Sequence, residues 1–309
     1  LLGAAGVIFA GLRFVHILQL ESYQGNMYLK WLNKHSSEYW PGLMTGFAAV
    51  ALSLCHVFFY YMEGFYGLSD AMPYVADGVY LALLLFLGVS EIKKQKVKPL
   101  KYTGRVNRLL AALGILTALF TVSEMFLALL RSSHLDYTLI YVMRYLPGML
   151  LPLFVLFAHL LTYPLESAVK RWYFNDAKRK LAARGDVIKI GITGSYGKTS
   201  TKFILGSILS ERYHTLVTPS SYNTSMGVTR AVREQLDPEH KVFVAEMGAR
   251  YKGDIKELCE LVRPEYGIIT SVGKQHLTTF GSLERIIATK SELLLALPKN
   301  GTAVINGDN

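Results

Sequence analysis

Long apolar runs dominate the first part of this sequence, and they end near residue 163. A helix needs roughly 20 apolar residues to cross the hydrocarbon core of a membrane. The whole chain has 309 residues, of which 51% are hydrophobic, and a mean hydropathy of +0.27, which is high for a soluble protein. We therefore predict an α-helical multi-span membrane domain with about five spans, at residues 1–20, 41–62, 73–92, 106–130 and 138–163.

Basic residues in the connections between these runs set the expected orientation, because cytoplasmic loops carry an excess of Lys and Arg. Residues 93–108, after the third run, are dense in both, whereas residues 63–72, before that run, contain neither. Alternation then places the N-terminus outside and everything after residue 163 inside. We expect a multi-pass protein of the cytoplasmic membrane, in contact with the lipid bilayer, whose soluble part faces the cytoplasm.

Four ionisable residues fall within or near the predicted spans: Asp77, Glu124, Arg144 and His159. Ionisable groups at such positions are candidates for function. Pairing between helices, or a position near the end of a span, is the favoured interpretation. No role is assigned to them.

Residues 164–186 combine aromatic side chains with Lys and Arg, as in the run KRWYFNDAKRK. This composition suits a basic helix lying at an anionic membrane surface, and a solvated linker helix is the alternative. Nucleic acid is not an expected partner, because no nucleic-acid-binding motif is present. The two cysteines, Cys55 and Cys259, lie one in each half and exclude a disulfide framework.

From residue 187 onward, short runs rich in β-branched residues alternate with helical stretches. This order predicts an α/β P-loop domain with a mostly parallel sheet wrapped by helices. Ligands of such sheets bind at the carboxyl ends of the strands. The expected strands are the runs VIKIGI, HTLVT, KVFVAEM, YGIITSV and TAVIN.

The first of these runs leads into the loop GSYGKTS and then into a helix. Glycines allow backbone N–H groups to surround phosphate oxygens, the lysine neutralises phosphate charge, and the threonine hydroxyl can bind Mg²⁺ at the helix N-terminus. The longer form of this motif has a glycine where Ile192 stands, so the match is to the shorter G-x-x-G-K-T form. The expected ATP-binding residues are Gly194, Ser195, Gly197, Lys198, Thr199 and Ser200.

The loop TGSYGKTST and five later segments resemble the central, ATP-binding domain of the Mur ligases, which form amide bonds in peptidoglycan precursor synthesis. The segments GSYGKTSTK, EMGAR and HLTTFGS are most similar to those of the branch that adds D-alanyl-D-alanine to UDP-N-acetylmuramoyl tripeptide. The resemblance covers about residues 187–309. The later segments are TPSSYNTSMGV, VAEMGAR, ITSVGKQHLTTFGS, ATKSELL and NGDN.

The resemblance implies a role for one residue in each later segment. Asn223 would contact the substrate, and Glu246 would bind Mg²⁺ together with Thr199. His276 would be linked to a metal ion, and Lys290 would be carbamylated and so able to bind metal. Lys198, His276 and Lys290 would be the catalytic residues, and the adenine would contact Asn306.

The implied activity is that of an ATP-dependent ligase that forms ADP and works through an acyl phosphate, with ATP and two Mg²⁺ ions. The expected substrates are a UDP-N-acetylmuramoyl peptide and an amine such as D-alanyl-D-alanine. The membrane runs occupy the place of the family's UDP-sugar-binding domain, and Thr229 stands where that branch has proline. A ligase of the same superfamily with another carboxylate substrate is therefore an alternative.

Two further classes of function stay open. An ATP-driven transporter would ordinarily show a hydrophobic strand ending in Asp-Glu or an LSGGQ run, and neither occurs here. A nucleotide-binding scaffold without turnover is the other alternative. The expected organisation is a membrane domain at residues 1–163, a basic interfacial linker helix at 164–186, and a Mur-ligase-like domain at 187–309 that ends short of its C-terminal part.

Overall fold

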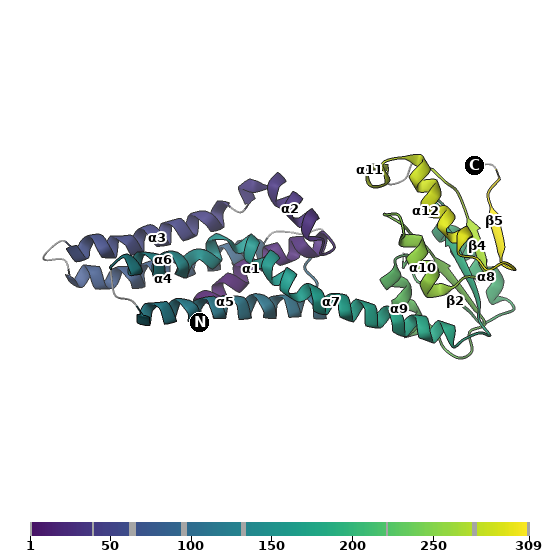
Figure 1. Ribbon diagram of the computed structural model, residues 1–309, viewed down its shortest axis with the longest axis horizontal. Helices are drawn as coiled ribbons and strands as arrows, with labels where there is room; N and C mark the ends of the chain where they lie inside the picture. The colour runs from purple at the N-terminus through teal and green to yellow at the C-terminus, as the bar shows by residue number, and fades with distance from the viewer. Residues whose placement is uncertain are drawn as a thin grey trace. The chain divides into compact units, whose positions relative to one another are not determined.

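The computed structural model of the protein describes residues 2–38, 40–61, 66–93, 98–130, 134–220, 222–273 and 277–307. The chain forms two compact units, Leu1–Glu166 and Ser167–Asn309. Figure 1 shows that the first contains only helices and the second combines helices with strands. They are called the helical unit and the α/β unit below.

The helical unit is a bundle whose apolar side chains pack between neighbouring helices. α1 contacts α4 and α5, and α3 contacts α4 and α6. The core of the bundle includes Val15, Leu84, Leu113 and Val155, all fully buried. The helices are α1 (Leu2–Leu20), α2 (Gly25–Lys34), α3 (Trp40–Tyr61), α4 (Tyr66–Lys93), α5 (Gly104–Leu130), α6 (His134–Met149) and α7 (Leu151–Ala182), with a 3₁₀ turn at Ser36–Glu38.

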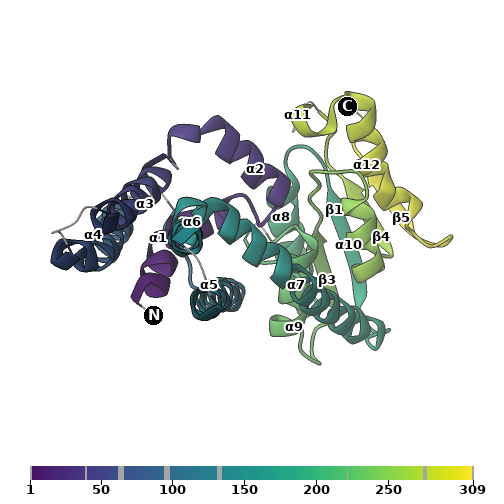
Figure 2. The same ribbon diagram turned by 60° about the vertical axis from the view of Figure 1, so that its left-hand side comes forward.

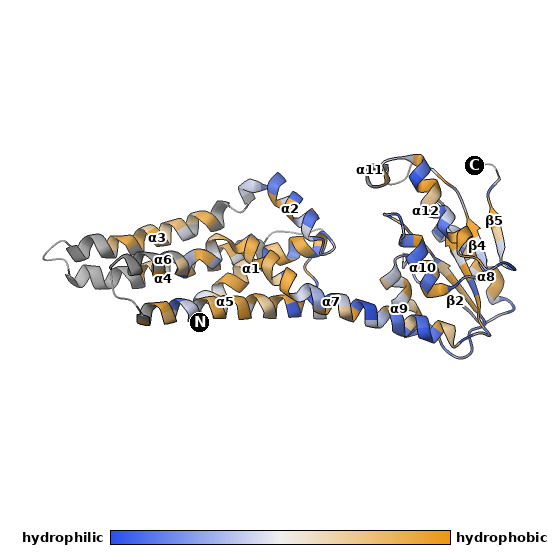
Figure 3. Cartoon of the chain, in the orientation of Figure 1, coloured by the Kyte–Doolittle hydropathy of each residue, from blue (hydrophilic) through white to orange (hydrophobic). Residues whose placement is uncertain are grey.

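Within the described residues, three helices are long and apolar enough to cross a membrane: Gly3–Leu20, Gly104–Leu127 and Leu151–Ala182. The first two coincide with the predicted spans 1–20 and 106–130. A shorter apolar stretch, Tyr74–Ser90, lies within the third predicted span. Figure 3 shows mainly apolar colouring on α1 and α5, and the change from apolar to hydrophilic residues along α7.

The fifth predicted span, 138–163, is wrong as a single helix. α6 ends at Met149 and α7 begins at Leu151, with Leu150 between them in a turn. Pro152 lies in the first turn of α7, where proline is favoured because its missing N–H group has no helical partner to lose. α7 then continues without a break from the apolar residues through the basic segment to Ala182.

Three of the four ionisable residues noted in the predicted spans, Asp77, Glu124 and Arg144, pair between helices, as the favoured interpretation expected. The guanidinium of Arg144 on α6 donates to Glu124 Oε1 on α5 at 2.8 Å and to Asp77 Oδ2 on α4 at 3.0 Å. The Tyr145 hydroxyl donates to Asp77 Oδ1 at 2.9 Å. His159 is buried, with its ring 6.5 Å from that of Tyr23.

The α/β unit is built on a five-stranded, entirely parallel sheet with the strand order β2-β3-β1-β4-β5. All five predicted strands are present. β1 and β3 are buried along almost their whole length because both faces of the sheet are covered there, whereas β5 is an exposed edge strand. The strands are β1 (Ile188–Thr193), β2 (Thr215–Val217), β3 (Val242–Glu246), β4 (Tyr266–Ile269) and β5 (Thr302–Ile305).

Helices cover both faces of this sheet, as Figure 2 shows. On one face, α8 packs against Ile190, Ile192 and Val244. On the other, α9, α10, α12 and the end of α7 share a core that includes Phe243 and Leu293. The helices after α7 are α8 (Lys198–Ser210), α9 (Ser225–Gln235), α10 (Asp254–Val262), α11 (Leu277–Phe280) and α12 (Leu283–Leu295).

Candidate active site

The glycine-rich loop lies between the carboxyl end of β1 and the first turn of α8. Gly197 adopts a left-handed conformation with φ of 79° and begins the helix without a side-chain cap. A side chain at Gly194 would collide with Thr270, so the chain can pass there only with glycine. The uncapped N–H groups and the helix dipole make this helix end suitable for binding an anion.

The loop that follows β4 holds the glycine-rich loop in place through hydrogen bonds. The Ser195 N–H donates to Ser271 O at 2.6 Å. The buried Ser195 hydroxyl donates to Gly273 O at 3.0 Å and accepts from Gly273 N–H at 2.9 Å. Thr270 Oγ1 donates to Tyr196 O at 2.6 Å. Both the side chain and the backbone N–H of Ser195 are therefore occupied by the neighbouring loop.

Two lysine side chains converge on one carbonyl oxygen of the loop. Lys198 Nζ donates to Gly194 O at 2.8 Å and to Ser195 O at 3.2 Å, and Lys290 Nζ, from α12, donates to Gly194 O at 2.9 Å. Burial lowers the pKa of Lys198, while the charge of Glu246 acts to raise it. Burial, and then the charge of Lys198, lower the pKa of Lys290 to about 8. This concentration of positive charge suits a polyanion such as a nucleotide triphosphate.

A buried carboxylate lies at the end of β3, next to β1. Glu246 is 1% exposed, and it accepts hydrogen bonds at 3.0 Å from Thr199 Oγ1 and from Asn223 Nδ2. Lys202 Nζ lies 3.0 Å from the carboxylate oxygen Oε2. Burial acts to raise the pKa of Glu246, but the hydrogen bonds from these three side chains outweigh it and hold the pKa below its usual range.

The hydroxyl of Thr199 and the carboxylate of Glu246 are hard oxygen donors, the type that Mg²⁺ prefers. They lie 3.0 Å apart at the N-terminus of α8. Lys290, if converted to a carbamate, would add a further anionic oxygen donor beside Gly194. The donor set on this side of the loop therefore fits a magnesium ion.

The remaining predicted site residues are more dispersed. Ser200 is exposed in the first turn of α8. Asn306 follows β5, two strands away from β1, and its N–H donates to Ile269 O at 3.3 Å. His276 lies outside the described residues. The structure thus brings Gly194, Lys198, Thr199, Asn223, Glu246 and Lys290 together.

The segment that supplies these residues also matches a known domain. Residues 192–309 match the family model for the Mur ligase middle domain. These residues belong to the Mur ligase middle-domain family. The match contains the glycine-rich loop and every later segment on which the predicted resemblance was based, so that resemblance is confirmed for this part of the chain.

Curated relatives of the Mur ligase middle domain carry the name UDP-N-acetylmuramoyl-tripeptide--D-alanyl-D-alanine ligase. The protein from Escherichia coli strain K12 is 38% identical over 120 residues, covering 39% of this chain and 26% of the relative. The Mycobacterium tuberculosis H37Rv protein is 40% identical over 129 residues, covering 40% and 24%. This chain therefore spans about a quarter of the length of these relatives.

A crystal structure of MurF from Acinetobacter baumannii is also similar to this chain, with 33% sequence identity and a TM-score of 0.43. That similarity covers 44% of this chain and 30% of the other. MurF from Thermotoga maritima in complex with ADP has the same identity and TM-score, and covers 45% and 32%.

One residue of this Mur ligase middle domain had no predicted role although it lies among the site residues. Lys202 is fully buried on α8 and contacts Glu246, which is 44 positions later in the sequence. A lysine in the motif GKTSTK looks like an ordinary helix residue. Its inward orientation follows from the position of α8 on the sheet, which the sequence pattern does not reveal.

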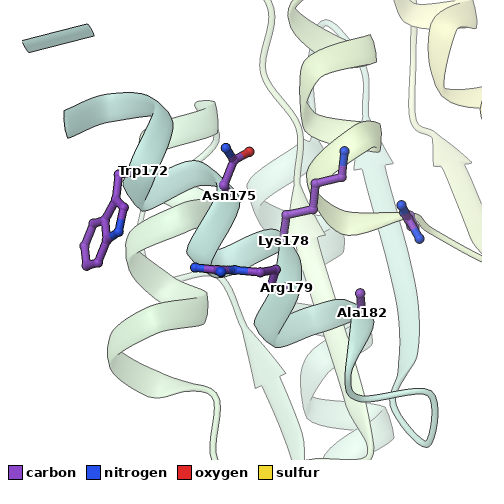
Figure 4. A pocket seen from close by; sticks show the side chains of 6 residues that line it. Trp172, Asn175, Lys178, Arg179 and Ala182 are labelled. Carbon is purple, nitrogen blue, oxygen red and sulfur yellow. The ribbon is translucent and has the colours of Figure 1, made fainter. Parts of the chain in front are cut away.

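An open cleft of about 590 Å³ lies outside this site, on α7 and the end of α10. Figure 4 shows its side chains extending from α7 in different directions, Arg179 to the left and Lys178 to the upper right. The cleft is thus a shallow basic surface and shares no residue with the Mur ligase site. It is lined by Trp172, Asn175, Lys178, Arg179, Ala182 and Arg263.

Proposed function

We propose that this protein is a membrane-anchored, ATP-dependent amide ligase that adds D-alanyl-D-alanine to a UDP-N-acetylmuramoyl peptide in peptidoglycan precursor synthesis. The observation that carries the proposal is the meeting of Lys198 and Lys290 at Gly194 O, beside the buried carboxylate of Glu246. This arrangement lies inside a Mur ligase middle domain. The curated relatives named above are ligases of that branch.

In the proposed reaction, an oxygen of the substrate carboxylate attacks the γ-phosphorus of ATP, and the bond to the bridging oxygen breaks to release ADP. The amine of the second substrate then attacks the carbonyl carbon of the acyl phosphate. Inorganic phosphate leaves, and the amine loses a proton as the amide forms. Both reactants of the first step are anions, so neutralising charge is the main task of the site.

The residues of this chain have separate parts in that task. The N–H groups of the loop and the ammonium of Lys198 would bind the phosphates, and Asn223 would orient the carboxylate substrate. Thr199 and Glu246 would hold Mg²⁺, which supplies further positive charge at the transferring phosphoryl group. Asn306 would contact the adenine, and His276 would add a metal contact.

Lys290 would act as a carbamate in this proposal. Its lowered pKa of about 8 means that a useful fraction of the amine is uncharged near neutral pH. The uncharged nitrogen attacks carbon dioxide, one N–H proton is lost to solvent, and the product is an anionic carbamate. The carbamate would bind metal, whereas an ammonium would repel it.

The proposed location is the cytoplasmic membrane, with the α/β unit on the cytoplasmic side, where ATP is available. Three helices long and apolar enough to span a membrane support it, together with the basic residues of segment 98–108, which runs into the start of α5. The basic and aromatic part of α7 follows directly on an apolar stretch of the same helix. This arrangement suits the headgroup region of an anionic membrane.

The deciding experiment is phosphate release by the full chain in detergent or nanodiscs with Mg²⁺, ATP and UDP-N-acetylmuramoyl tripeptide, with and without D-alanyl-D-alanine. Release is expected to require both substrates and to fail in Lys198→Ala, and the pentapeptide product should be seen by mass spectrometry. ATP binding without stimulation by either substrate would contradict the proposed substrates.

A ligase of the same superfamily that takes another carboxylate is the second candidate. The observation that favours it is the apolar helical bundle formed by the residues that precede the α/β unit. A lipid-linked or non-wall carboxylate that stimulates phosphate release in the same assay would support this candidate. The Lys198→Ala control applies equally to it.

A further inference from the structure

Lys202 is a fully buried lysine to which the proposed mechanism gives no part. Its Nζ donates to Ser220 O at 2.6 Å and lies 3.0 Å from Glu246 Oε2. Taking an ammonium and a carboxylate out of water is costly, and such a pair is weak support for stability compared with apolar residues of similar size. The buried pair of Lys202 and Glu246 is therefore better explained by a role other than stability.

One role open to Lys202 is to orient the Glu246 carboxylate. Its two oxygens offer about four acceptor sites. Thr199 and Lys202 use two on Oε2, and the amide of Asn223 uses one on Oε1. About one acceptor site therefore remains, on Oε1. Lys202 thus helps to determine which oxygen of the carboxylate stays available to a metal ion.

A second role open to Lys202 is to hold the loop between β2 and α9. Ser220 has a φ of 42°, an uncommon left-handed conformation for a residue other than glycine, and its carbonyl is the one that Lys202 holds. Conformations of this kind persist when the surroundings impose them. Three residues later, Asn223 contacts Glu246 and accepts from Gly248 N–H at 2.7 Å.

We propose that Lys202 is a positioning residue: it ties the nucleotide-loop helix α8 to Glu246 and to the Ser220 carbonyl, so that the metal-binding carboxylate and Asn223 are held ready for a magnesium–nucleotide complex. The identity of that ligand rests on the proposed function. Lys202 needs no contact with the nucleotide in this role. It acts through Glu246 and the loop.

A purely structural role for Lys202 makes a different prediction. Loss of a buried filler would weaken the fold without changing how strongly Mg²⁺ promotes ATP binding. A positioning role requires that Mg²⁺ lose its influence while ATP alone binds as before. The ratio of the two ATP dissociation constants, in EDTA and in Mg²⁺, separates these two possibilities.

The test measures that ratio for the full chain in nanodiscs, by displacement of a fluorescent ATP analogue. In Lys202→Met, the promotion of ATP binding by Mg²⁺ should fall about tenfold to a hundredfold, the equivalent of one charge-assisted hydrogen bond, with affinity in EDTA changed less than about threefold. The exposed Lys256→Met is the matched control and should keep the wild-type ratio. A folded Lys202→Met protein with the wild-type ratio overturns the proposal.

A double-mutant cycle shows whether Lys202 acts through Glu246. The Glu246→Gln protein should lose the promotion of ATP binding by Mg²⁺. The double variant Lys202→Met/Glu246→Gln should show no further loss of that promotion. Independent, multiplying effects would overturn the proposal. If Lys202→Met does not fold, Lys202→Gln takes its place in the cycle, since its amide can still donate a hydrogen bond but carries no charge.

Hydrogen exchange supplies a readout that needs no nucleotide. In Lys202→Met, the amides of Thr218, Ser220 and residues 222–224 should exchange faster, while those of β1 and β3 keep their protection. Unchanged exchange in this segment would count against the proposal. Failure of the proposed function stays distinguishable. If the wild type shows Mg²⁺-promoted ATP binding but no ligation, only the ligase fails, and if ligation occurs with a normal ratio in Lys202→Met, only this inference fails.

Discussion

The two units of the molecule each contain a cluster of acidic and basic side chains, and the clusters differ in burial. In the helical unit, the side chains of Arg144 and Asp77 are 39% and 42% exposed within the bundle. In the α/β unit, those of Lys202 and Glu246 are 0% and 1% exposed. The second cluster is the more costly to bury, so it needs a stronger reason to exist.

The clusters also differ in their balance of charge. In the bundle, the guanidinium of Arg144 donates to the carboxylates of both Glu124 and Asp77, so each acid has a cationic partner although the formal charges sum to −1. In the α/β unit, the cluster of Lys202 and Glu246 also includes Lys198 and Lys290, whose ammonium groups share a neutral carbonyl. Three lysines thus face one carboxylate and leave positive charge uncompensated. A self-satisfied cluster, whose charged groups are partners of one another, holds helices together. An uncompensated cluster, with an excess of positive charge, suits an anionic ligand.

The largest expected effect concerns the uncompensated cluster. Lys198→Ala should lower ATP turnover by about 10²- to 10³-fold, as removal of one donor to a developing charge does in other enzymes. Its free energy of unfolding should change by about 1 kcal/mol or less, because only hydrogen bonds to loop carbonyls are lost. Phosphate-release kinetics and thermal denaturation measure the two effects.

Lys256→Ala, on the exposed side of α10, is the control for Lys198→Ala and should retain full turnover. Turnover within about threefold of wild type in a folded Lys198→Ala protein would remove the phosphate-binding role of the loop. It would also erase the proposed difference between the two clusters.

Lys290 allows a prediction about stability with a definite dependence on pH. Its pKa is lowered from the ordinary 10.5 to about 8, first by burial and then by Lys198, so the folded protein holds this proton less tightly than the unfolded chain. The charged ammonium therefore destabilises the fold by a constant amount below pH 8, and that cost shrinks as the pH rises towards 10.5. In buffer freed of carbon dioxide, where Lys290 stays an amine, Lys290→Met should thus raise the free energy of unfolding by roughly 1–3 kcal/mol at pH 7 and by less at pH 10.

Thermal denaturation of the Lys290→Met protein at both pH values, with Lys256→Met beside it, measures this difference. The same variant should lose turnover, as expected for a site residue whose charge costs stability. A lower melting temperature at both pH values would instead mean that the hydrogen bond to Gly194 O outweighs the cost of burying the charge.

The sequence predicted the strands and the glycine-rich loop because their signals are local. Runs such as KVFVAEM carry their own pattern, and the loop is a contiguous motif. The division at Leu150 depends on how Pro152 is accommodated, which an apolar run of sufficient length conceals. Lys202 could not be found because its contact with Glu246 joins positions that only the packing of α8 on the sheet brings together. The roles of all the site residues, His276 and Asn306 among them, stay predictions.

The next effect tests the self-satisfied cluster of the bundle. Arg144→Met leaves the carboxylate of Glu124, whose side chain is 7% exposed, without its guanidinium partner. We expect a loss of about 1–2 kcal/mol of stability, less than for a fully buried pair because Arg144 is partly exposed. Arg144→Met/Glu124→Gln should recover part of it, and ATP affinity should stay within about twofold of wild type in both. A large loss of ATP affinity would show that the bundle cluster is coupled to the nucleotide site.

The smallest effect sets the baseline against which both clusters are judged. Lys170 Nζ lies 3.5 Å from Glu257 Oε1, and the two side chains are 53% and 40% exposed. Exposed pairs of this kind contribute little, so Lys170→Ala should change the free energy of unfolding by less than about 0.5 kcal/mol, and 0.5 M salt should abolish the difference. Thermal denaturation at two salt concentrations measures it. An effect above about 1 kcal/mol would mean that exposure is a poor guide to the strength of ion pairs in this protein. The contrast between its partly exposed and its buried cluster would then have to rest on measured coupling energies instead.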